Sequence, residues 1–307
     1  MKILLAVDGS EASTIAISAV GSLSLPPDST VELLTVIPDT PWTSGPWPAV
    51  TMIQPHEDLG RVRAEVGARL DDIAGSPGAG GRTMRTKVLH GRPASETVLE
   101  AARFGADLLV VGAQGYGVVE RILLGSVSSE VVDQAPCPVL VVRVPGIARV
   151  LLATDGSADG DLAAAFVRDF SIFGDPAVKV LSVVDPGMPW WVGMAAVDAL
   201  AAGDAYATVV HAAQKHAQEV AAATTDRLRI DHVMAESRPI EGEVGSTIVN
   251  AASAWHADVV ALGTRGHGVV HRALVGSTSR YVLHHAPMSV LIVRPARAGS
   301  SARADAA

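Results

Sequence analysis

The sequence predicts an α/β protein made of two tandem doubly wound domains, each a five-stranded parallel sheet with helices on both faces. Three observations support this prediction. Short apolar runs alternate along the chain with segments of helical spacing, the order that produces parallel strands joined by crossover helices. The apolar runs lack polar alternation, as strands covered on both faces do. The same order of motifs occurs twice within 307 residues, a length that suits two domains of about 150 residues.

The repeat sets the expected domain limits. A strand that ends in Asp-Gly-Ser at 8–10 recurs 147 residues later at 155–157. We therefore expect a first domain over 1–145 and a second over 146–295, joined by a short Pro-Gly linker. The segment 296–307 has little to bury and is expected to form a mobile tail.

Apolar runs, together with the turn and capping residues between them, predict each element of the first half. Strands are expected at 2–7, 31–37, 86–89, 108–111 and 139–142. Helices are expected after Ser10, from about 57 to 73, from 94 to 104 with a start near Ser95, and from Ser126 to Gln134. Ser10 should cap its helix, because a serine hydroxyl accepts a hydrogen bond from the first turn. The second half repeats this order with its own insertions.

Composition and charge exclude several classes of protein. The formal net charge of −8 argues against a nucleic-acid partner. There is no run of 18 apolar residues and therefore no predicted membrane span, and the apolar stretch 3–7 is too short for a signal peptide. Cys137 is the single cysteine. We expect it to be buried, with a redox role as the alternative, and we expect the protein to be cytoplasmic.

Each half contains a glycine-rich crossing from a strand to a helix. Gly112 and Gly115 are followed, after nine further residues, by Gly125-Ser126. The second half repeats this spacing at Gly263, Gly266, Gly276 and Ser277. Glycines let the backbone turn its N–H groups toward an anion, and a helix N-terminus adds donors and a favourable dipole. The pattern indicates a phosphate site in each half; the alternative is that the glycines only form tight turns.

These signatures, together with Val7-Asp8-Gly9-Ser10, Thr154-Asp155-Gly156-Ser157 and the closing segment 135–142, resemble the universal stress protein family in its tandem, ATP-binding form. The resemblance covers nearly the whole chain except the tail. It implies Rossmann-like domains that hold ATP, together with Mg²⁺, at the carboxyl ends of the strands where the winding reverses.

The resemblance also implies a role for each residue of the two sites. Asp8 and Asp155 would bind the ribose hydroxyls, with helix capping as the alternative. The backbone that frames the adenine would lie near Ala6, Val36, Ala153 and Val183. The phosphates of the first half would be held by Gly112, Gln114, Gly115, Gly117, Gly125, Ser126 and Ser128. Those of the second half would be held by Gly263, Arg265, Gly266, Gly268, Gly276, Ser277 and Ser279.

The two loops differ between their first two glycines. The first half has Gln114 and the second has Arg265, where the family often has a basic residue. If that side chain neutralises phosphate, the second site should bind more tightly. Arg121 and Arg272 occur at matching places in both loops. For each arginine, a solvated surface charge is the alternative.

Four aromatic residues lie near the expected sites. Trp42 and Trp190 follow the second strand of each half. Loop packing is favoured for both, with stacking near the base or a dimer contact as the alternatives. Tyr116 and His267 lie within the glycine loops, and a surface position is favoured over a catalytic role.

The sequence shows no machinery for fast catalysis. Neither loop contains a lysine, and no Walker motif or metal-ligand spacing occurs. We therefore expect an ATP-binding sensor or regulator of the stress response, read by a regulatory protein partner, with at most slow ATP hydrolysis. The alternatives are a weak ATPase or nucleotidyl transferase that needs a partner, and a nucleotide-free dimerising scaffold. Because the family pairs domains through the fifth strand, 139–142 and 290–293 are expected to form either a homodimer or an intrachain contact.

Overall fold

The computed structural model describes residues 1–39, 59–76, 84–114, 124–170, 172–184, 204–228, 233–239, 243–264 and 275–295. The first half forms β1 (Lys2–Ala6), α1 (Glu11–Ser22), β2 (Thr30–Pro38), α2 (Leu59–Ala74), β3 (Met84–Gly91), α3 (Pro93–Phe104), β4 (Leu108–Gly112), α4 (Ser126–Gln134) and β5 (Val139–Val142). The second half forms β6 (Arg149–Ala153), α5 (Ala158–Phe170), β7 (Ala177–Val184), α8 (Asp204–Leu228), β8 (Val233–Pro239), α9 (Val244–Ala254), β9 (Val259–Gly263), α10 (Ser277–His285) and β10 (Ser289–Val293).

Each half winds its strands outward from a central pair. β1 pairs in parallel with both β2 and β4, and β6 pairs in parallel with both β7 and β9. The chain runs outward through β2 to β3 and then returns to β4 on the other side of β1, so the winding reverses between β1 and β4. The second half reverses in the same way between β6 and β9. The predicted doubly wound parallel sheet is therefore confirmed in each half.

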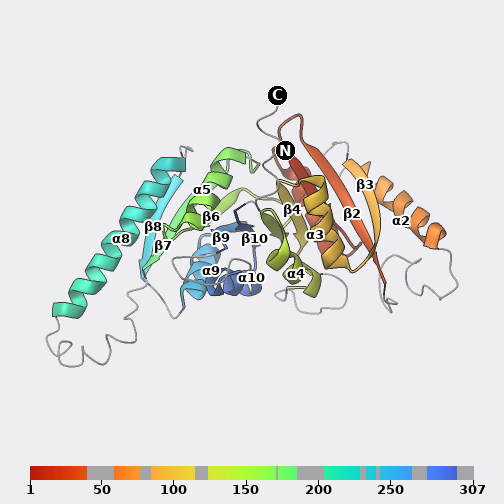
Figure 1. Ribbon diagram of the computed structural model, residues 1–307. Coiled ribbons are helices and arrows are strands. Elements are labelled where there is room, and N and C mark those ends of the chain that lie inside the picture. Colours follow the sequence, from red (N-terminus) through yellow and green to blue (C-terminus); the bar gives the residue numbers. More distant parts are fainter. Residues whose placement is uncertain are drawn as a thin grey trace, which may run out of the picture.

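The two halves share one ten-stranded sheet with the order β3-β2-β1-β4-β5-β10-β9-β6-β7-β8 (Figure 1). β5 and β10 meet at its centre and run antiparallel, with Leu140 opposite Leu291. The expected contact between fifth strands is thus formed within one chain. Each of the two hydrophobic core clusters contains residues of both halves, so the cores continue across this seam.

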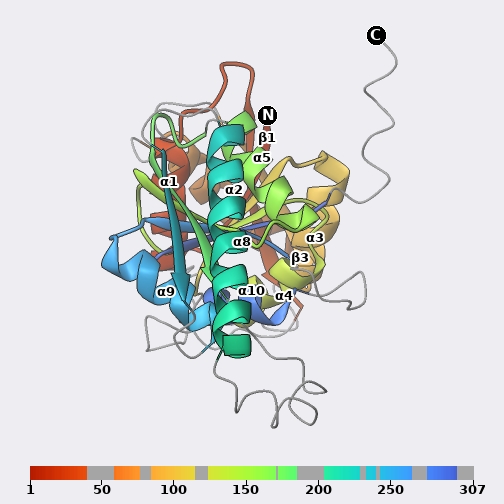
Figure 2. The same ribbon diagram turned by 90° about the vertical axis from the view of Figure 1, so that its left-hand side faces the viewer.

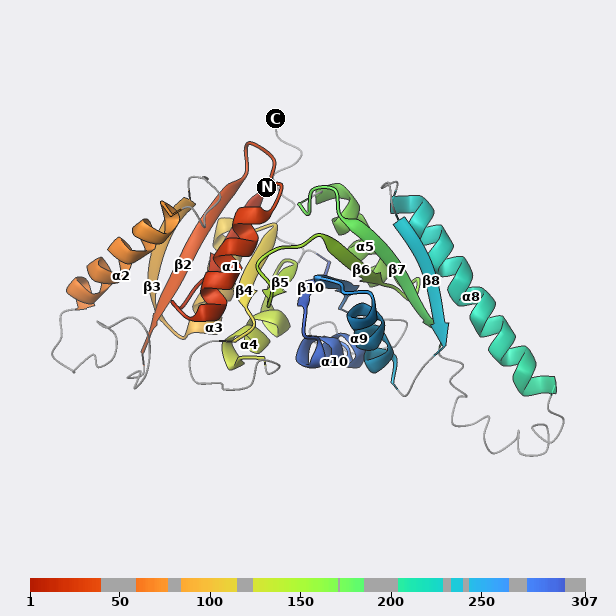
Figure 3. The same cartoon turned by 180° about the vertical axis from the view of Figure 1, so that it is seen from behind.

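Helices cover both faces of the sheet. Side chains of α1, α2, α5 and α8 belong to the core on one face, and those of α3, α4, α9 and α10 to the core on the other. Figure 3 views the molecule from behind and shows α1 lying in front of the sheet. In Figure 2 the end of the sheet that α8 covers faces the viewer. Along β1, Ile3 and Leu5 pack toward α1 whereas Leu4 packs toward the opposite face. Burying such a side chain stabilises the fold by about 1.5–3 kcal/mol, which explains the continuous apolar runs.

Two arginines tie the halves together beside the seam. Arg143 follows β5 and donates a hydrogen bond from Nη2 to the main-chain oxygen of Leu283 in α10, at 2.7 Å. Arg294 follows β10 and donates from Nη1 to the main-chain oxygen of Ala135, which caps α4, at 2.8 Å. Each cation therefore lies at the C-terminal end of a helix of the other half, where the helix dipole favours positive charge.

β3 is longer than the sequence predicts. The expected strand covers 86–89, but β3 pairs with β2 over its whole length, from Met84 to Gly91. Polar residues interrupt this edge strand, so its apolar pattern is shorter than the strand itself. α3 begins at Pro93 rather than near Ser95, because the fixed φ of proline suits the first helical position. β1 ends one residue earlier than expected, β2 is longer by one residue at both ends, and β4 is longer by one residue at its C-terminal end.

Cys137 is buried, as the sequence predicts. Burial raises the pKa of its thiol to about 12. None of the helices in the described ranges combines the length and the hydropathy that crossing a membrane requires. The expected tail at 296–307 lies outside the described residues, as do Trp42 and Trp190.

Candidate functional site

The turns after β1 and β6 have the same geometry. Gly9 and Gly156 both have φ of 78°, a conformation that glycine adopts without strain. Oδ1 of Asp8 accepts a hydrogen bond from the main-chain N–H two residues later at 3.0 Å, and Oδ1 of Asp155 does the same at 3.0 Å. Ser10 caps α1 by accepting from a first-turn N–H, as predicted. Both carboxylates therefore bind a main-chain N–H just before the helix rather than one in its first turn, so they stabilise the turn and do not cap the helix. The ribose role remains a prediction.

Different hydroxyl groups lie beside the two turns. In the first half, Oγ of Ser13 donates to Oδ1 of Asp8 at 2.6 Å. Gly160 stands at the equivalent place in the second half, where a Cβ would lie 2.7 Å from Oγ1 of Thr154. The hydroxyl of Thr154 instead accepts from the N–H of Gly156 at 3.2 Å. The second half thus has glycine in place of serine, and a threonine hydroxyl just after the end of β6.

The starts of α4 and α10 leave main-chain donors without side-chain caps. Gly125 and Gly276 are the N-cap residues, neither helix has a side-chain capping bond, and neither has an acidic residue in its first turn. Ser126 and Ser277 are the first residues of the helices and are exposed. The free N–H groups and the helix dipole make both helix starts suitable for an anion.

Main-chain bonds join each helix start to the end of the preceding strand. The N–H of Gly125 donates to the oxygen of Ala113 at 2.8 Å, and the N–H of Gly276 donates to the oxygen of Thr264 at 2.7 Å. In each half, the beginning and the end of the glycine signature therefore lie close together. They meet beside the carboxyl end of β4 in the first half and beside that of β9 in the second.

Two predicted phosphate-binding serines make hydrogen bonds within the protein. Oγ of Ser128 donates to the main-chain oxygen of Gly112, and Oγ of Ser279 donates to that of Gly263, both at 2.7 Å. Both serines are buried. Their hydroxyls thus fasten the helix to the strand end, and the structure gives them this role besides any contact with a ligand.

Close packing explains the first glycine of each signature. A Cβ on Gly112 would lie 2.9 Å from the carbonyl carbon and Cβ of Ala12 in α1. A Cβ on Gly263 would lie 2.6 Å from the main-chain carbonyl of Asp159 in α5. Real Cβ atoms avoid such distances, so these glycines are needed for helix packing whether or not a ligand is bound.

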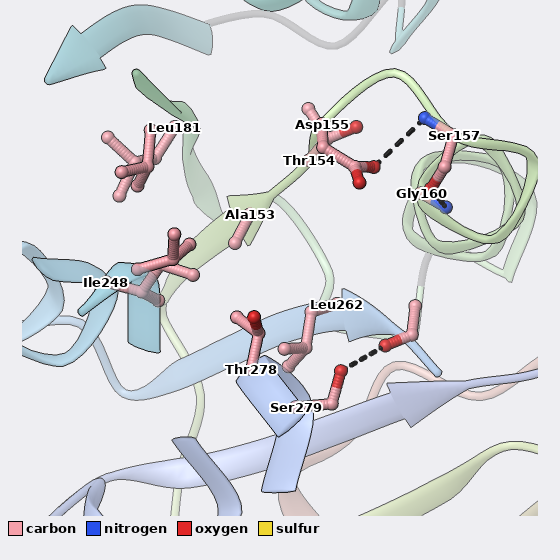
Figure 4. Close-up of a pocket in the computed structure, with 13 residues that line it drawn as sticks. Ala153, Thr154, Asp155, Ser157, Gly160, Leu181, Ile248, Leu262, Thr278 and Ser279 are labelled. Atoms are coloured by element: carbon pink, nitrogen blue, oxygen red, sulfur yellow. Dashed lines mark hydrogen bonds between the residues drawn. The ribbon is translucent and has the colours of Figure 1, made fainter. Parts of the chain in front are cut away.

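A cavity of about 100 Å³ opens at the carboxyl ends of β6, β7 and β9 (Figure 4). It brings together five residues that the sequence predicts for the second site: Ala153, Asp155, Val183, Gly263 and Ser279. An apolar side is formed by Leu181, Val183, Val244, Ile248 and Leu262. A polar side is formed by Thr154, Asp155, Ser157, Thr278 and Ser279. This pairing of an apolar wall with convergent polar groups is typical of small-molecule sites.

Sequence reasoning missed part of this wall. Val244 and Ile248 project from the first turns of α9, which no predicted motif contains. Their spacing of four residues along a helix, and the alternation of Leu181 with Val183 along β7, were available as signals. Thr278 lines the cavity, whereas Ser277 is not among its lining residues.

The predicted residues of the first half lie at matching places. Ala6 is the last residue of β1, and Val36 lies within β2. Gln114 follows β4 and is half-buried. Five predicted binding residues lie outside the described residues: Gly115, Gly117, Arg265, Gly266 and Gly268. So do Arg121, Arg272, Tyr116 and His267.

A second cavity, of about 320 Å³, lies between α1 and α2, next to the turn that follows β1. Its lining residues are Val7, Gly9, Ser13, Thr14, Ile17, Arg69, Asp72 and Ile73. Ser13 therefore contacts both this cavity and the carboxylate of Asp8.

Comparison with known proteins identifies the family. The model of the universal stress protein family matches residues 1–143 and again residues 146–294. The chain is 26% identical over 311 aligned positions to a universal stress protein of Mycolicibacterium smegmatis, covering 95% of this chain and 97% of that protein. It is 32% identical over 148 residues to one from Methanocaldococcus jannaschii, covering 47% of this chain and 82% of that protein.

A solved structure shares the architecture of the whole chain. The crystal structure of a universal stress protein from Archaeoglobus fulgidus matches with a TM-score of 0.62 at 20% identity, covering 95% of this chain and 98% of that one. At this identity the likeness shows the fold alone. Because the family model matches nearly all of the chain in two successive copies, this protein belongs to the universal stress protein family.

Proposed function

We propose that each half binds ATP at the carboxyl edge of the sheet and that the protein acts as a nucleotide-dependent sensor or regulator of a stress response. The observation that carries the proposal is the pair of helix starts at Gly125 and Gly276, which have no side-chain cap and no acidic residue in their first turns. Both lie beside the point where the winding reverses, the usual place for a ligand in such sheets.

The cavity of the second half fits the parts of a nucleotide. Its apolar side, which includes Val183 and Ile248, suits a base, and its polar side, which includes Asp155, suits a ribose. The described residues enclose about 100 Å³, whereas small-molecule sites usually measure roughly 300–1,000 Å³. The described walls therefore form only part of the proposed nucleotide site, and the phosphates would be held by the helix start and the rest of the glycine signature.

We propose slow rather than fast chemistry. Of the described residues that line the cavity, none carries a positive side chain, whereas phosphoryl transfer requires cations aimed at the transferred group. Bound ATP, with Mg²⁺ on its phosphates, would instead stabilise one arrangement of the surrounding loops, which a regulatory protein in the cytoplasm would read. Arg265 leads us to expect tighter binding in the second half than in the first, where Gln114 takes its place.

The first test is chemical. Protein purified without added nucleotide is denatured, and the released nucleotide is identified and counted. We expect ATP in the supernatant. Added ATP should also raise the melting temperature, because a ligand that binds only the folded state stabilises it by mass action.

Substitutions connect this result to the signatures. Gly115→Val with Gly266→Val should abolish nucleotide retention, because side chains there would fill the proposed phosphate cradles. Gly146→Ala is the matched control, since a Cβ at this position meets nothing within 4 Å. Unchanged nucleotide content in the double variant would contradict the proposal.

The nucleotide-free scaffold remains the second candidate, because helix packing by itself accounts for Gly112 and Gly263. It predicts no released nucleotide, no heat on titration with ATP and no thermal shift. A third outcome, turnover above about 1 s⁻¹, the low end of typical enzymes, would favour a true ATPase.

A further inference from the structure

The cavity between α1 and α2 is distinct from the proposed nucleotide site. It measures about 320 Å³, within the range of roughly 300–1,000 Å³ that small-molecule sites usually occupy. Val7 and Ile17, which line it, belong to the core on the α1 face of the sheet. Leu181 and Ile248, which line the proposed nucleotide cavity, belong to the core on the opposite face. The two cavities therefore lie on opposite faces of the sheet and in different halves.

The second half packs the equivalent place differently. α5 packs against α8 more closely than α1 packs against α2. A Cβ on Gly156, in the turn after β6, would lie 3.0 Å from Cγ2 of Val220 in α8. Asp161, which the repeat aligns with Thr14, has its Oδ1 3.0 Å from Nη2 of Arg227 in the same helix. α8 therefore reaches the turn in the second half, whereas the space beside the turn after β1 stays open in the first.

The lining of the cavity combines apolar side chains with one charge of each sign. Val7, Ile17 and Ile73 form its apolar part. Arg69, which is half-buried, and Asp72, which is exposed, lie three residues apart on α2. This spacing places two side chains on the same side of a helix, about 5–6 Å apart at Cβ. A guanidinium offers a fork of donors to a carboxylate, and a carboxylate accepts hydrogen bonds from an ammonium group.

We propose that the cavity between α1 and α2 binds a small zwitterion with an aliphatic side chain, the chemistry of an apolar amino acid. The carboxylate of the ligand would meet Arg69, its ammonium group would meet Asp72, and its side chain would cover Val7 and Ile17. Binding at this site does not depend on the proposed function. Because α8 reaches the equivalent turn of the second half, we expect one ligand per chain.

Ser13 connects this cavity to the proposed nucleotide site. Its side chain is buried and lines the cavity, and its Oγ donates to Oδ1 of Asp8 at 2.6 Å. The N–H of Asp8 donates to the same Oγ at 2.9 Å. A ligand that packs against Ser13 would hold these bonds in place, and a carboxylate that is already fixed loses less freedom when it binds a ribose. We therefore expect the zwitterion to raise the ATP affinity of the first half, a consequence that rests on the proposed function.

The first test uses L-leucine as the probe, with the full-length protein and no nucleotide. NMR titration should show saturable binding of one molecule per chain. Thr14→Phe should abolish binding, because Thr14 lines the cavity from the exposed surface of α1 and the ring would fill it. Ala64→Phe, at an exposed position of α2 outside the lining, is the matched control and should retain binding. Melting curves verify that each variant is folded.

Two analogues of leucine test the roles of the two charges. Isocaproate lacks the ammonium group, and isoamylamine lacks the carboxylate. Each should bind about tenfold more weakly than L-leucine, because it loses a hydrogen bond between charged groups. The preference over isocaproate should disappear in Asp72→Asn, and the preference over isoamylamine should disappear in Arg69→Gln. Arg63→Gln, at an exposed position of α2 outside the lining, should change neither preference.

The link to the nucleotide site is tested separately. Calorimetry measures ATP affinity with and without saturating L-leucine in a Val183→Phe chain, in which the new ring fills the cavity of the second half. We expect L-leucine to increase ATP affinity by at least about 5-fold, the low end of the usual coupling between two ligands. Ser13→Ala should remove this increase, because it removes the hydroxyl that holds Asp8.

The outcomes separate the site from the function of the nucleotide. No saturable binding of L-leucine, or equal binding in Thr14→Phe and wild type, would overturn the proposal. An analogue that binds as tightly as L-leucine would refute the recognition of a zwitterion. If L-leucine binds and ATP does not, the proposed function fails and the site between α1 and α2 stands. If both bind and neither affects the other, the link through Ser13 is wrong.

Discussion

Arg294 reaches from the end of β10 to the main-chain oxygen of Ala135, in the other half of the molecule, with an N–O distance of 2.8 Å. It also donates to the main-chain oxygens of Val132 and Asp133. Within the described residues, the side chain of its counterpart Arg143 donates only to the main-chain oxygen of Leu283. The Nε and Nη1 atoms of Arg143 are buried and have no hydrogen-bond partner among those residues. The two seam arginines are therefore equivalent in position but not in bonding.

This difference predicts unequal effects of the same substitution. Arg294→Met should lower the free energy of unfolding by about 1.5–3 kcal/mol, the value of a hydrogen bond to a charged group. Arg143→Met should cost less, because burial already lowers the pKa of Arg143 to about 10 and its removal relieves that desolvation. Denaturation in urea measures both, and an equal or larger loss at Arg143 would contradict this account.

The first half buries two acidic residues where α3 packs on β2. Glu32 and Glu100 are both buried, and Nζ of Lys87 lies 2.6 Å from Oε1 of Glu100. Burial, followed by repulsion from the Glu100 carboxylate, raises the pKa of Glu32 above its ordinary 4.5, while Lys87 and Arg85 oppose the rise. The folded protein therefore binds this proton more tightly than the unfolded chain does.

That shift makes stability depend on pH. The contribution of Glu32 is fully present below pH 4.5 and is lost as the pH rises through its raised folded pKa. Glu32→Gln should raise the free energy of unfolding near neutral pH and flatten its decline above pH 4.5. Glu65→Gln, in an exposed ion pair with Arg61, is the control and should leave the profile unchanged. Parallel profiles for wild type and Glu32→Gln would refute the assignment.

Ser128 and Ser279 test whether a buried hydroxyl serves the fold or the ligand. Each donates to a strand-end carbonyl at 2.7 Å. Replacing either with alanine should lower the free energy of unfolding by about 0.5–1.5 kcal/mol, the net value of a typical hydrogen bond. ATP affinity, measured by calorimetry on the folded variants, should fall less than in the Gly115→Val and Gly266→Val chain. If the free energy of ATP binding falls by more than the free energy of unfolding, these hydroxyls instead contact the phosphates.

Gly112 and Gly263 should tolerate no side chain. Gly263→Ala places a methyl group 2.6 Å from the main chain of Asp159, and Gly112→Ala places one 2.9 Å from Ala12. Overpacking of this kind costs about 1–3 kcal/mol, and we expect the larger loss at Gly263. Gly146→Ala, which meets nothing within 4 Å, should be neutral in the same thermal melts. Equal melting temperatures for all three variants would exclude the packing explanation.

Cys137 should be unreactive in the folded protein. Its thiol is buried, and burial raises its pKa to about 12, so the reactive thiolate is scarce at neutral pH. Alkylation followed by mass spectrometry should label it only after denaturation. Rapid labelling of the native protein would restore the redox alternative.

Local patterns predicted much of the architecture. The uninterrupted apolar run of β1 follows from burial on both faces, and Ser10 caps α1 because its hydroxyl reaches a first-turn N–H. The spacing of the glycine signatures identified both helix starts, since Ser126 and Ser277 open α4 and α10. Such features depend on residues close together in the chain, and for this reason a sequence can specify them.

Only the tertiary structure decided which of these residues meet. Val244 and Ile248 reach the cavity because α9 packs beside β7 and α10, and no local motif marks them. The Asp159–Thr264 bond joins residues 105 positions apart, and the antiparallel contact of β5 with β10 forms within the chain although the same edges could serve two copies. The amino-acid order by itself determined the repeated strand-and-helix pattern, because propensity and burial act locally. Contacts across the sheet depend on how the elements dock, which the spacing of residues along the chain does not contain.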